Sequence, residues 1–159
     1  MLVKVISGGQ TGADRAGLIA AKAAGLQTGG WMPKGFRALD GYKTNFAVEY
    51  CIQEHTSPLY PPRTYANAAG SDGTVRFASD WDSRGEICTL KAINKAKKPY
   101  FDVNVLGGVQ PAELAAWIVK NKIKTLNVAG NTERTSRGIE EFVIAFLTET
   151  FRLVLLEQP

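Results

Sequence analysis

Apolar stretches and helical patterns alternate along most of this chain. Four short runs of apolar, often β-branched residues predict buried strands: residues 2–7, 73–78, 99–105 and 124–129. Helical periodicity covers residues 14–24, 85–98 and 136–150, and a further helix is predicted from Pro111, a residue suited to a first helical turn. Apolar strands alternating with helices are typical of a parallel sheet covered on both sides. The sequence therefore predicts an α/β fold with a central, mostly parallel sheet flanked by helices.

One segment, from about residue 29 to residue 70, departs from this alternation. It is rich in aromatic residues, shows little periodicity and contains four prolines: Pro33, Pro58, Pro61 and Pro62. Pro62 is suited to begin a short helix that ends at Gly70. We expect this loop-rich insertion to lie over the carboxyl ends of the strands as a functional segment. Since no linker or internal repeat interrupts the chain, residues 1–159 are expected to form a single domain.

Composition narrows the class of protein. The chain has 159 residues, a mass of 17.2 kDa, 45% hydrophobic and 21% charged residues, which is typical of a folded domain rather than a disordered chain. No apolar run approaches the roughly 20 residues that a membrane span needs. The N-terminus is expected to be a strand rather than a signal peptide, and Cys51 and Cys88 lack disulfide or metal spacing, so we predict a cytoplasmic protein.

The net charge of +4 is mildly basic and dispersed. It suits a small anionic ligand, but it does not form the basic stripe that binding to nucleic acid would require.

The strongest motif, Ser-Gly-Gly-Gln-Thr-Gly-Ala-Asp-Arg over residues 7–15, follows the first predicted strand and opens the first helix. Glycines permit a sharp turn and close approach of a ligand, and a helix N-terminus offers free N–H donors to a phosphate. The spacing matches neither the dinucleotide fingerprint nor the P-loop. Seven residues here are candidate ligand contacts: Gly8, Gly9, Gln10, Thr11, Gly12, Asp14 and Arg15. The structural alternative is a tight turn with Thr11 as the helix N-cap.

Four further polar groups are candidate contributors to the same site. Their candidate ligand contacts are, group by group, Lys34, Gly35 and Arg37; Arg63, Asn67, Ser71, Asp72, Gly73 and Thr74; Arg84 and Thr89; and Gly130 and Asn131. Lys34 and Arg37 stand beside aromatic residues, which suits a planar phosphorylated ligand. Around Arg84, an alternative is purely structural, because Ser83 and Glu86 have the spacing of a capping box.

The groups around Gly8, Arg84 and Gly130 lead into predicted helices, so three helix starts are expected at one edge of the sheet. His55 is the only histidine, and together with Cys51 it does not make a metal site. No nucleophile–histidine arrangement is present in the sequence, so we predict neither catalytic nor metal-binding residues.

In this order, the segments ISGGQTGADRAGL, GGWMPKGFRALDG, HTSPLYPPRTYANAAGSDGT and LNVAGN resemble the molybdenum carrier family. That family is related to the lonely guy and lysine-decarboxylase-like proteins. The resemblance implies a Rossmann-like three-layer fold, a homo-oligomer (dimer or tetramer), and binding of molybdenum cofactor or a similar phosphorylated pterin or nucleotide. It also implies that residues 8–12 form a phosphate loop, that Lys34 and Arg37 face the ligand, and that Arg63 and Asn67 belong to the family's R-T-x-x-N pattern.

Two functions follow as hypotheses. The first is a carrier that holds a phosphorylated ligand without transforming it. The alternative is a nucleotide-processing hydrolase: the related lonely guy enzymes pair an arginine with a glutamate to cleave N-glycosidic bonds, and Arg84 and Glu86 stand near that region. In that alternative Glu86 polarises a water molecule or stabilises an oxocarbenium-like centre.

Overall fold

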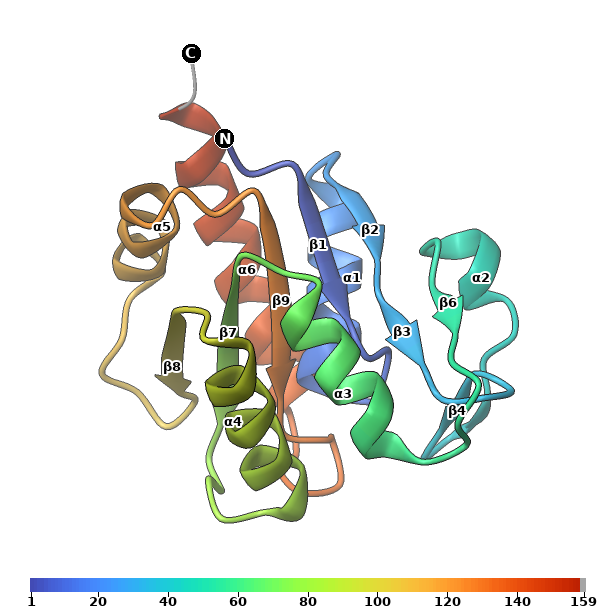
Figure 1. The fold of residues 1–159 in the computed structure, drawn as a ribbon. Helices are drawn as coiled ribbons and strands as arrows, with labels where there is room; N and C mark the ends of the chain where they lie inside the picture. The colour runs from blue at the N-terminus through green and yellow to red at the C-terminus, as the bar shows by residue number, and fades with distance from the viewer. Residues whose placement is uncertain (158–159) are drawn as a thin grey trace.

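The computed structural model describes residues 1–157 and is built around a sheet of five parallel strands in the order β2-β1-β9-β7-β8 (Figure 1). Its strands are β1 (Lys4–Ser7), β2 (Gln27–Gly29), β7 (Gly73–Ala78), β8 (Tyr100–Asn104) and β9 (Thr125–Gly130). The first and last strands of the chain are neighbours at the centre of the sheet. The inner strand β7 is buried at every position because it has strands on both sides and helices on both faces.

Helices cover both faces of this sheet, which confirms the predicted α/β class and its three layers. Behind it in Figure 1 lie α1 (Ala13–Ala23), α5 (Pro111–Lys120) and α6 (Ile139–Leu156), with α6 packed between the other two. In front lie α3 (Tyr60–Ala69) and α4 (Arg84–Ala96), which pack against each other. None of the helices within residues 1–157 has the length and apolar character that crossing a membrane requires.

The insertion between β2 and β7 is more regular than predicted. Besides α3 it contains β3 (Trp31–Met32), β4 (Arg37–Ala38), β5 (Gly41–Tyr42), α2 (Phe46–Glu49) and β6 (Gln53–Glu54), and its strands form two small two-stranded sheets. A separate apolar cluster, which includes Leu18 of α1 and Met32 and Phe46 of the insertion, anchors the insertion to the main domain.

Several boundaries differ from those predicted. Strand β2 was missed because it is short and mostly polar. Helix α3 begins at Tyr60, two residues before Pro62. Helix α6 begins only at Ile139, after Gly138 with a φ of 84°, and continues past residue 150 to Leu156.

Candidate ligand-binding cleft

A cleft of about 720 Å³ opens at the carboxyl edge of β1 and β9, between the first turns of α3 and α4. This volume is in the range of small-molecule sites. The cleft is lined by Gly8, Gln10, Asp14, Leu39, Tyr60, Pro61, Arg63, Thr64, Asn67, Ser83, Arg84, Gly85, Glu86, Cys88, Thr89, Asn127, Val128, Ala129, Gly130, Asn131, Thr132, Arg134 and Thr135. Four of the five predicted groups, those around Gly8, Arg63, Arg84 and Gly130, therefore contribute residues to the cleft, whereas the group around Lys34 does not.

The first loop reaches the cleft, but the chain itself already uses most of its N–H donors. The amide of Gly9 donates to Ser7 Oγ (3.2 Å), that of Gln10 to Asp14 Oδ2 (3.4 Å) and that of Thr11 to Gln10 Oε1 (3.0 Å). The expectation of an open phosphate loop is therefore wrong for these three amides. The N-cap of α1 is Gly12, not Thr11, with a φ of 87°.

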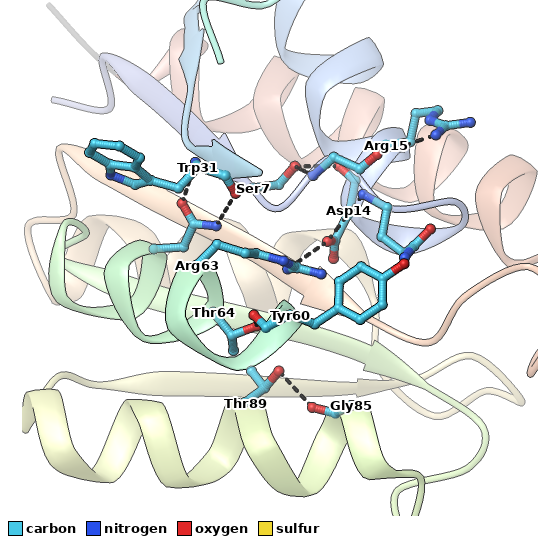
Figure 2. A network of polar contacts seen from close by, with 12 residues as sticks. Ser7, Asp14, Arg15, Trp31, Tyr60, Arg63, Thr64, Gly85 and Thr89 are labelled. Atoms are coloured by element: carbon cyan, nitrogen blue, oxygen red, sulfur yellow. Dashed lines mark hydrogen bonds and ion pairs between the residues drawn. The ribbon is translucent and has the colours of Figure 1, made fainter. Parts of the chain in front are cut away.

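Asp14 and Arg63 meet over this loop. Asp14 is only 6% exposed, and its Oδ2 lies 3.5 Å from Nη1 of Arg63, which reaches across from α3 (Figure 2). Burial raises the pKa of Asp14 to about 6, although Arg63 opposes this shift. A Cβ atom at Gly8 would lie 1.8 Å from the Arg63 Nη1, so a glycine is required for this close approach.

Arg15, another candidate from the first motif, is directed elsewhere. Its guanidinium forms two hydrogen bonds to Asp40, at 2.6 and 3.0 Å, and it does not line the cleft. The guanidinium of Arg15 holds the pKa of Asp40 well below its usual range. Arg15 thus fastens the insertion to α1.

The insertion lines the cleft with the aromatic ring of Tyr60 rather than with the expected cations Lys34 and Arg37. Lys34 is exposed, and neither it, Gly35 nor Arg37 lines the cleft. The Arg37 guanidinium instead lies 4.5 Å from the centre of the Tyr60 ring, and that of Arg63 lies 5.4 Å from the same ring. Tyr60, which does line the cleft, thus packs against both guanidinium groups.

Asn67 lines the cleft, but its side chain is engaged in holding the fold. Its amide accepts from Trp31 N (2.9 Å) and donates to Trp31 O (3.1 Å), so it pairs with β3 as another strand would. This pairing joins α3 to the insertion.

Ser71 to Thr74 lie away from the cleft. They precede or begin β7, at the amino edge of the sheet, where Asp72 Oδ2 accepts hydrogen bonds from the amides of Lys124 and Thr125. Ser71 donates to Ala68 O, and Thr74 accepts from Asn127. The structure therefore does not bring these four candidates to the other site residues.

The start of α4 is the helix N-terminus that remains open to the cleft. Ser83 is its N-cap and accepts from the amide of Glu86 (3.3 Å). The N–H groups of Arg84 and Gly85 donate to no other described residue. Thr89, further along the same face, donates to Gly85 O (2.9 Å; Figure 2). Only half of the expected capping box forms, because the Glu86 side chain turns into the protein.

Glu86 is the most unusual group in the cleft. It is 1% exposed, and its Oε2 has no hydrogen-bond partner among residues 1–157. The nearest cation is Arg76 Nη1 at 3.7 Å, but Asp102 holds the Arg76 guanidinium by two hydrogen bonds of 2.8 and 2.7 Å. Burial raises the pKa of Glu86 to about 8, against the opposing effect of Arg76.

The last loop uses several of its side chains to satisfy main-chain groups, but the amides of Thr132 and Arg134, two lining residues, donate to no other described residue. The Asn131 side chain accepts from the amides of Ser79 and Asp80, both at 3.0 Å, and donates to Asp80 O. Glu133 accepts from the amides of Gly138 (2.5 Å) and Glu140 (3.1 Å). The third expected anion-binding helix start, that of α6, is thus closed by the chain's own carboxylate.

Sequence reasoning missed several polar residues that line the cleft, among them Arg134, Tyr60, Cys88 and Asn127. Arg134 lies in the same polar loop as the predicted contacts Gly130 and Asn131. Its positive charge was the signal that could have marked it as a ligand contact. Neither His55 nor Cys51 lines the cleft, and among the described residues no cluster of three or more His, Cys, Asp or Glu could hold a metal ion.

A parallel sheet with a polar cleft outside the carboxyl ends of its strands defines a Rossmann-like, ligand-binding class of protein. Residues 5–151 match the model of the circularly permutated YpsA SLOG family, and the chain belongs to that family. It is also similar to the crystal structure of a putative molybdenum carrier protein from Syntrophus aciditrophicus, with 32% sequence identity, a TM-score of 0.84 and 94% of each chain covered. These findings confirm the resemblance predicted from the motifs. No curated protein sequence matches the chain.

Proposed function

We propose that the cleft binds a phosphorylated pterin or nucleotide and holds it without chemical change, with molybdenum cofactor as the leading candidate. The observation that carries this proposal is the open start of α4, where Arg84 and Arg134 line the cleft mouth as exposed side chains. Neither arginine forms an ion pair with another described residue. Free helix N–H groups beside guanidinium groups suit a phosphate.

The rest of the cleft suits the remainder of such a ligand. Tyr60, Pro61 and Leu39 offer apolar and aromatic surface to a planar ring. The molybdenum part of the proposal comes from the similar protein of Syntrophus aciditrophicus, which bears the name of a carrier. A homo-oligomeric state and a cytoplasmic location remain predictions.

The test is calorimetry with molybdenum cofactor, molybdate and common mononucleotides, alongside mass spectrometry of any ligand that co-purifies. In Arg84→Ala/Arg134→Ala we expect affinity for a phosphorylated ligand to fall by about ten- to a hundredfold, because charge-assisted hydrogen bonds are lost. Lys34→Ala is the control, since Lys34 is exposed and outside the cleft. Absence of heat and of retained ligand for every compound would overturn the proposal.

Hydrolysis of a nucleotide N-glycosidic bond is the second candidate. It is favoured by two buried carboxyl groups with unlike pKa values, about 6 for Asp14 and about 8 for Glu86, lining one cleft. Near neutral pH, Asp14 would act as the base and Glu86 as the acid, rather than Glu86 polarising the water. Water would supply hydroxide to the sugar C1′ and a proton to the departing base. Release of free base from nucleoside monophosphates, abolished in Glu86→Gln, would favour this enzyme over a carrier.

A further inference from the structure

We propose that Glu86 recognises the ring of the ligand: its carboxylate accepts two adjacent N–H donors of a 2-amino-4-oxopyrimidine, the edge that guanine and pterins share. This inference rests on the proposed function, because it specifies the ring chemistry of the ligand in the same cleft.

The first support is an unused acceptor on a residue that lines the cleft. Glu86 is 1% exposed and its Oε2 is buried without a hydrogen bond, although Glu86 lines the cleft. Buried polar atoms without partners are rare in folded proteins and costly, so a ligand that supplies the partner gains the free energy that the free protein lacks.

The second support is that the described residues place no donor within hydrogen-bond distance of this oxygen, the nearest cation being Arg76 Nη1 at 3.7 Å. Arg76 of β7 gives Nε and Nη2 to Asp102 of β8, and its Nη1 donates to the main-chain oxygen of Glu86 (3.3 Å). The other charged groups that act on the Glu86 carboxyl are Asp14 of α1 and Asp80 after β7, both negative. Surroundings with more carboxylates than cations favour a ring edge made of N–H donors over one that carries acceptors or negative charge.

The position of Glu86 also fits a ligand that enters ring first. Arg84 and Arg134 are exposed at the cleft mouth, whereas Glu86 is buried. A phosphate on the two arginines would leave the ring directed inward. Glu86 also borders a smaller cavity of about 450 Å³ on its other side, but neither Arg84 nor Arg134 lines that cavity. We therefore assign the ring to the larger cleft.

An ionised carboxylate distinguishes ring edges by its two acceptors. Guanine and pterin present two neighbouring N–H donors, one on the ring and one on the 2-amino group, and both can reach the same carboxylate. Adenine and cytosine place an acceptor beside their amino group, which would oppose the carboxylate. A protonated Glu86 would have the reverse preference, since it offers one donor and one acceptor.

The decisive measurement compares guanosine and inosine 5′-monophosphates on the unaltered protein by calorimetry. The two differ only in the 2-amino group, so we expect guanosine monophosphate to bind about ten- to a hundredfold more tightly. Adenosine monophosphate should bind no more tightly than inosine monophosphate, because adenine presents an acceptor where inosine keeps one N–H donor. Equal binding of guanosine and inosine monophosphates, or a preference for adenosine monophosphate, would overturn the inference while leaving the proposed function intact. If none of the three nucleotides and no pterin phosphate bound, the proposed function itself would fail.

Glu86→Gln tests the residue. This variant should bind guanosine and inosine monophosphates with similar affinity, whereas Glu141→Gln, an exposed change on α6, should retain the discrimination. Because the nucleotide comparison uses the unaltered protein, it remains decisive even if Glu86→Gln does not fold. Full discrimination in a folded Glu86→Gln variant would overturn the assignment.

Proton release provides an independent measure. The free Glu86 carboxyl holds its proton to a pKa of about 8, so a ligand that requires the ionised form must expel that proton near pH 7. Calorimetry in two buffers with different ionisation heats should show release of up to one proton with guanosine monophosphate or a pterin phosphate, and none in Glu86→Gln. Equal release in both proteins would contradict the role of Glu86.

Discussion

The Arg63 guanidinium lies 3.5 Å from the Asp14 carboxylate, directly over the place where a side chain at Gly8 would begin. The Asp14 carboxylate accepts from the amide of Gln10, and Ser7 and Gln10 take the amides of Gly9 and Thr11, so three donors expected to hold a phosphate are already used. Charge recognition in this cleft is consequently left to the start of α4, to the amides of Thr132 and Arg134 and to the arginines at its mouth. The same pair gives the first prediction.

In the unaltered protein the Asp14 carboxyl should titrate near pH 6, because burial disfavours its charge more than Arg63 favours it. Arg63→Met removes the favourable charge and should raise the pKa of Asp14 further, by about one unit. The measurement is an NMR titration of the side-chain carboxyl carbons. Lys34→Ala serves as the control, and an unchanged Asp14 titration in Arg63→Met would show that the two groups are not coupled.

Stability should fall with rising pH because of Glu86. Its pKa is about 8 in the folded chain and near the ordinary value of 4.5 when unfolded, so the folded state binds more protons between these values. The stabilising contribution is complete below about pH 4.5 and is lost as the pH rises through 8. Glu86→Gln cannot ionise, so its unfolding free energy should decline less over this interval, by a few kcal/mol. Urea unfolding at several pH values measures the difference.

The Asp14 contribution has the same sign, but it is complete below about pH 4 and lost through pH 6, and both proteins share it. The comparison above pH 6 therefore isolates Glu86. Parallel curves for the two proteins in that range would mean that the Glu86 carboxyl is not held protonated by the fold.

Substitution of Asn67 tests whether its side chain stabilises the fold or contacts the ligand. Because its amide satisfies both the N–H and the carbonyl of Trp31, Asn67→Ala should leave two main-chain groups without partners and cost roughly 2–4 kcal/mol of stability. Thermal and urea unfolding measure this loss. Reduced ligand affinity with unchanged stability would instead favour the ligand contact that the R-T-x-x-N pattern implies.

The sequence predicted the framework because strands such as β7 contain runs of buried apolar residues and their helices are strongly periodic. The predicted range 73–78 coincides with the observed strand, since neighbours on both sides and both faces bury every position, including Thr74 and Arg76. Strand β2 contains Gln27 and Thr28 and lies at the sheet edge, so neither hydrophobicity nor length distinguished it from a loop.

For the site, the sequence indicated the right loops but not the direction of their side chains. Ser83 and Glu86 have capping-box spacing, yet Glu86 turns inward toward Arg76, a residue that no local pattern connects to it. Likewise, Asp72 follows the Asn67 segment closely in sequence but lies at the opposite edge of the sheet, because α3 runs between the two edges. Such relationships depend on packing between elements, which spacing along the chain does not encode.

The glycines at the cleft should differ sharply in their tolerance of a side chain. At Gly130, φ is 151° and a Cβ atom would lie 2.0 Å from the main-chain oxygen of Phe77 on β7, which cannot move without breaking the sheet. At Gly8 the obstacle is the end of the Arg63 side chain, which can swing away. Gly130→Ala should therefore lose several kcal/mol or fail to fold, whereas Gly8→Ala should fold with a modest loss.

Gly8→Ala should nevertheless reproduce the electrostatic effect of losing Arg63. With the guanidinium displaced, the pKa of Asp14 should rise as in Arg63→Met, and the NMR titration described above would detect it. Urea unfolding ranks the two alanine variants by stability. A Gly130→Ala protein with an unaltered unfolding midpoint would contradict the close packing of β9 against β7 beside the cleft. An unshifted Asp14 pKa in Gly8→Ala would mean that Arg63 reaches the carboxylate by another route.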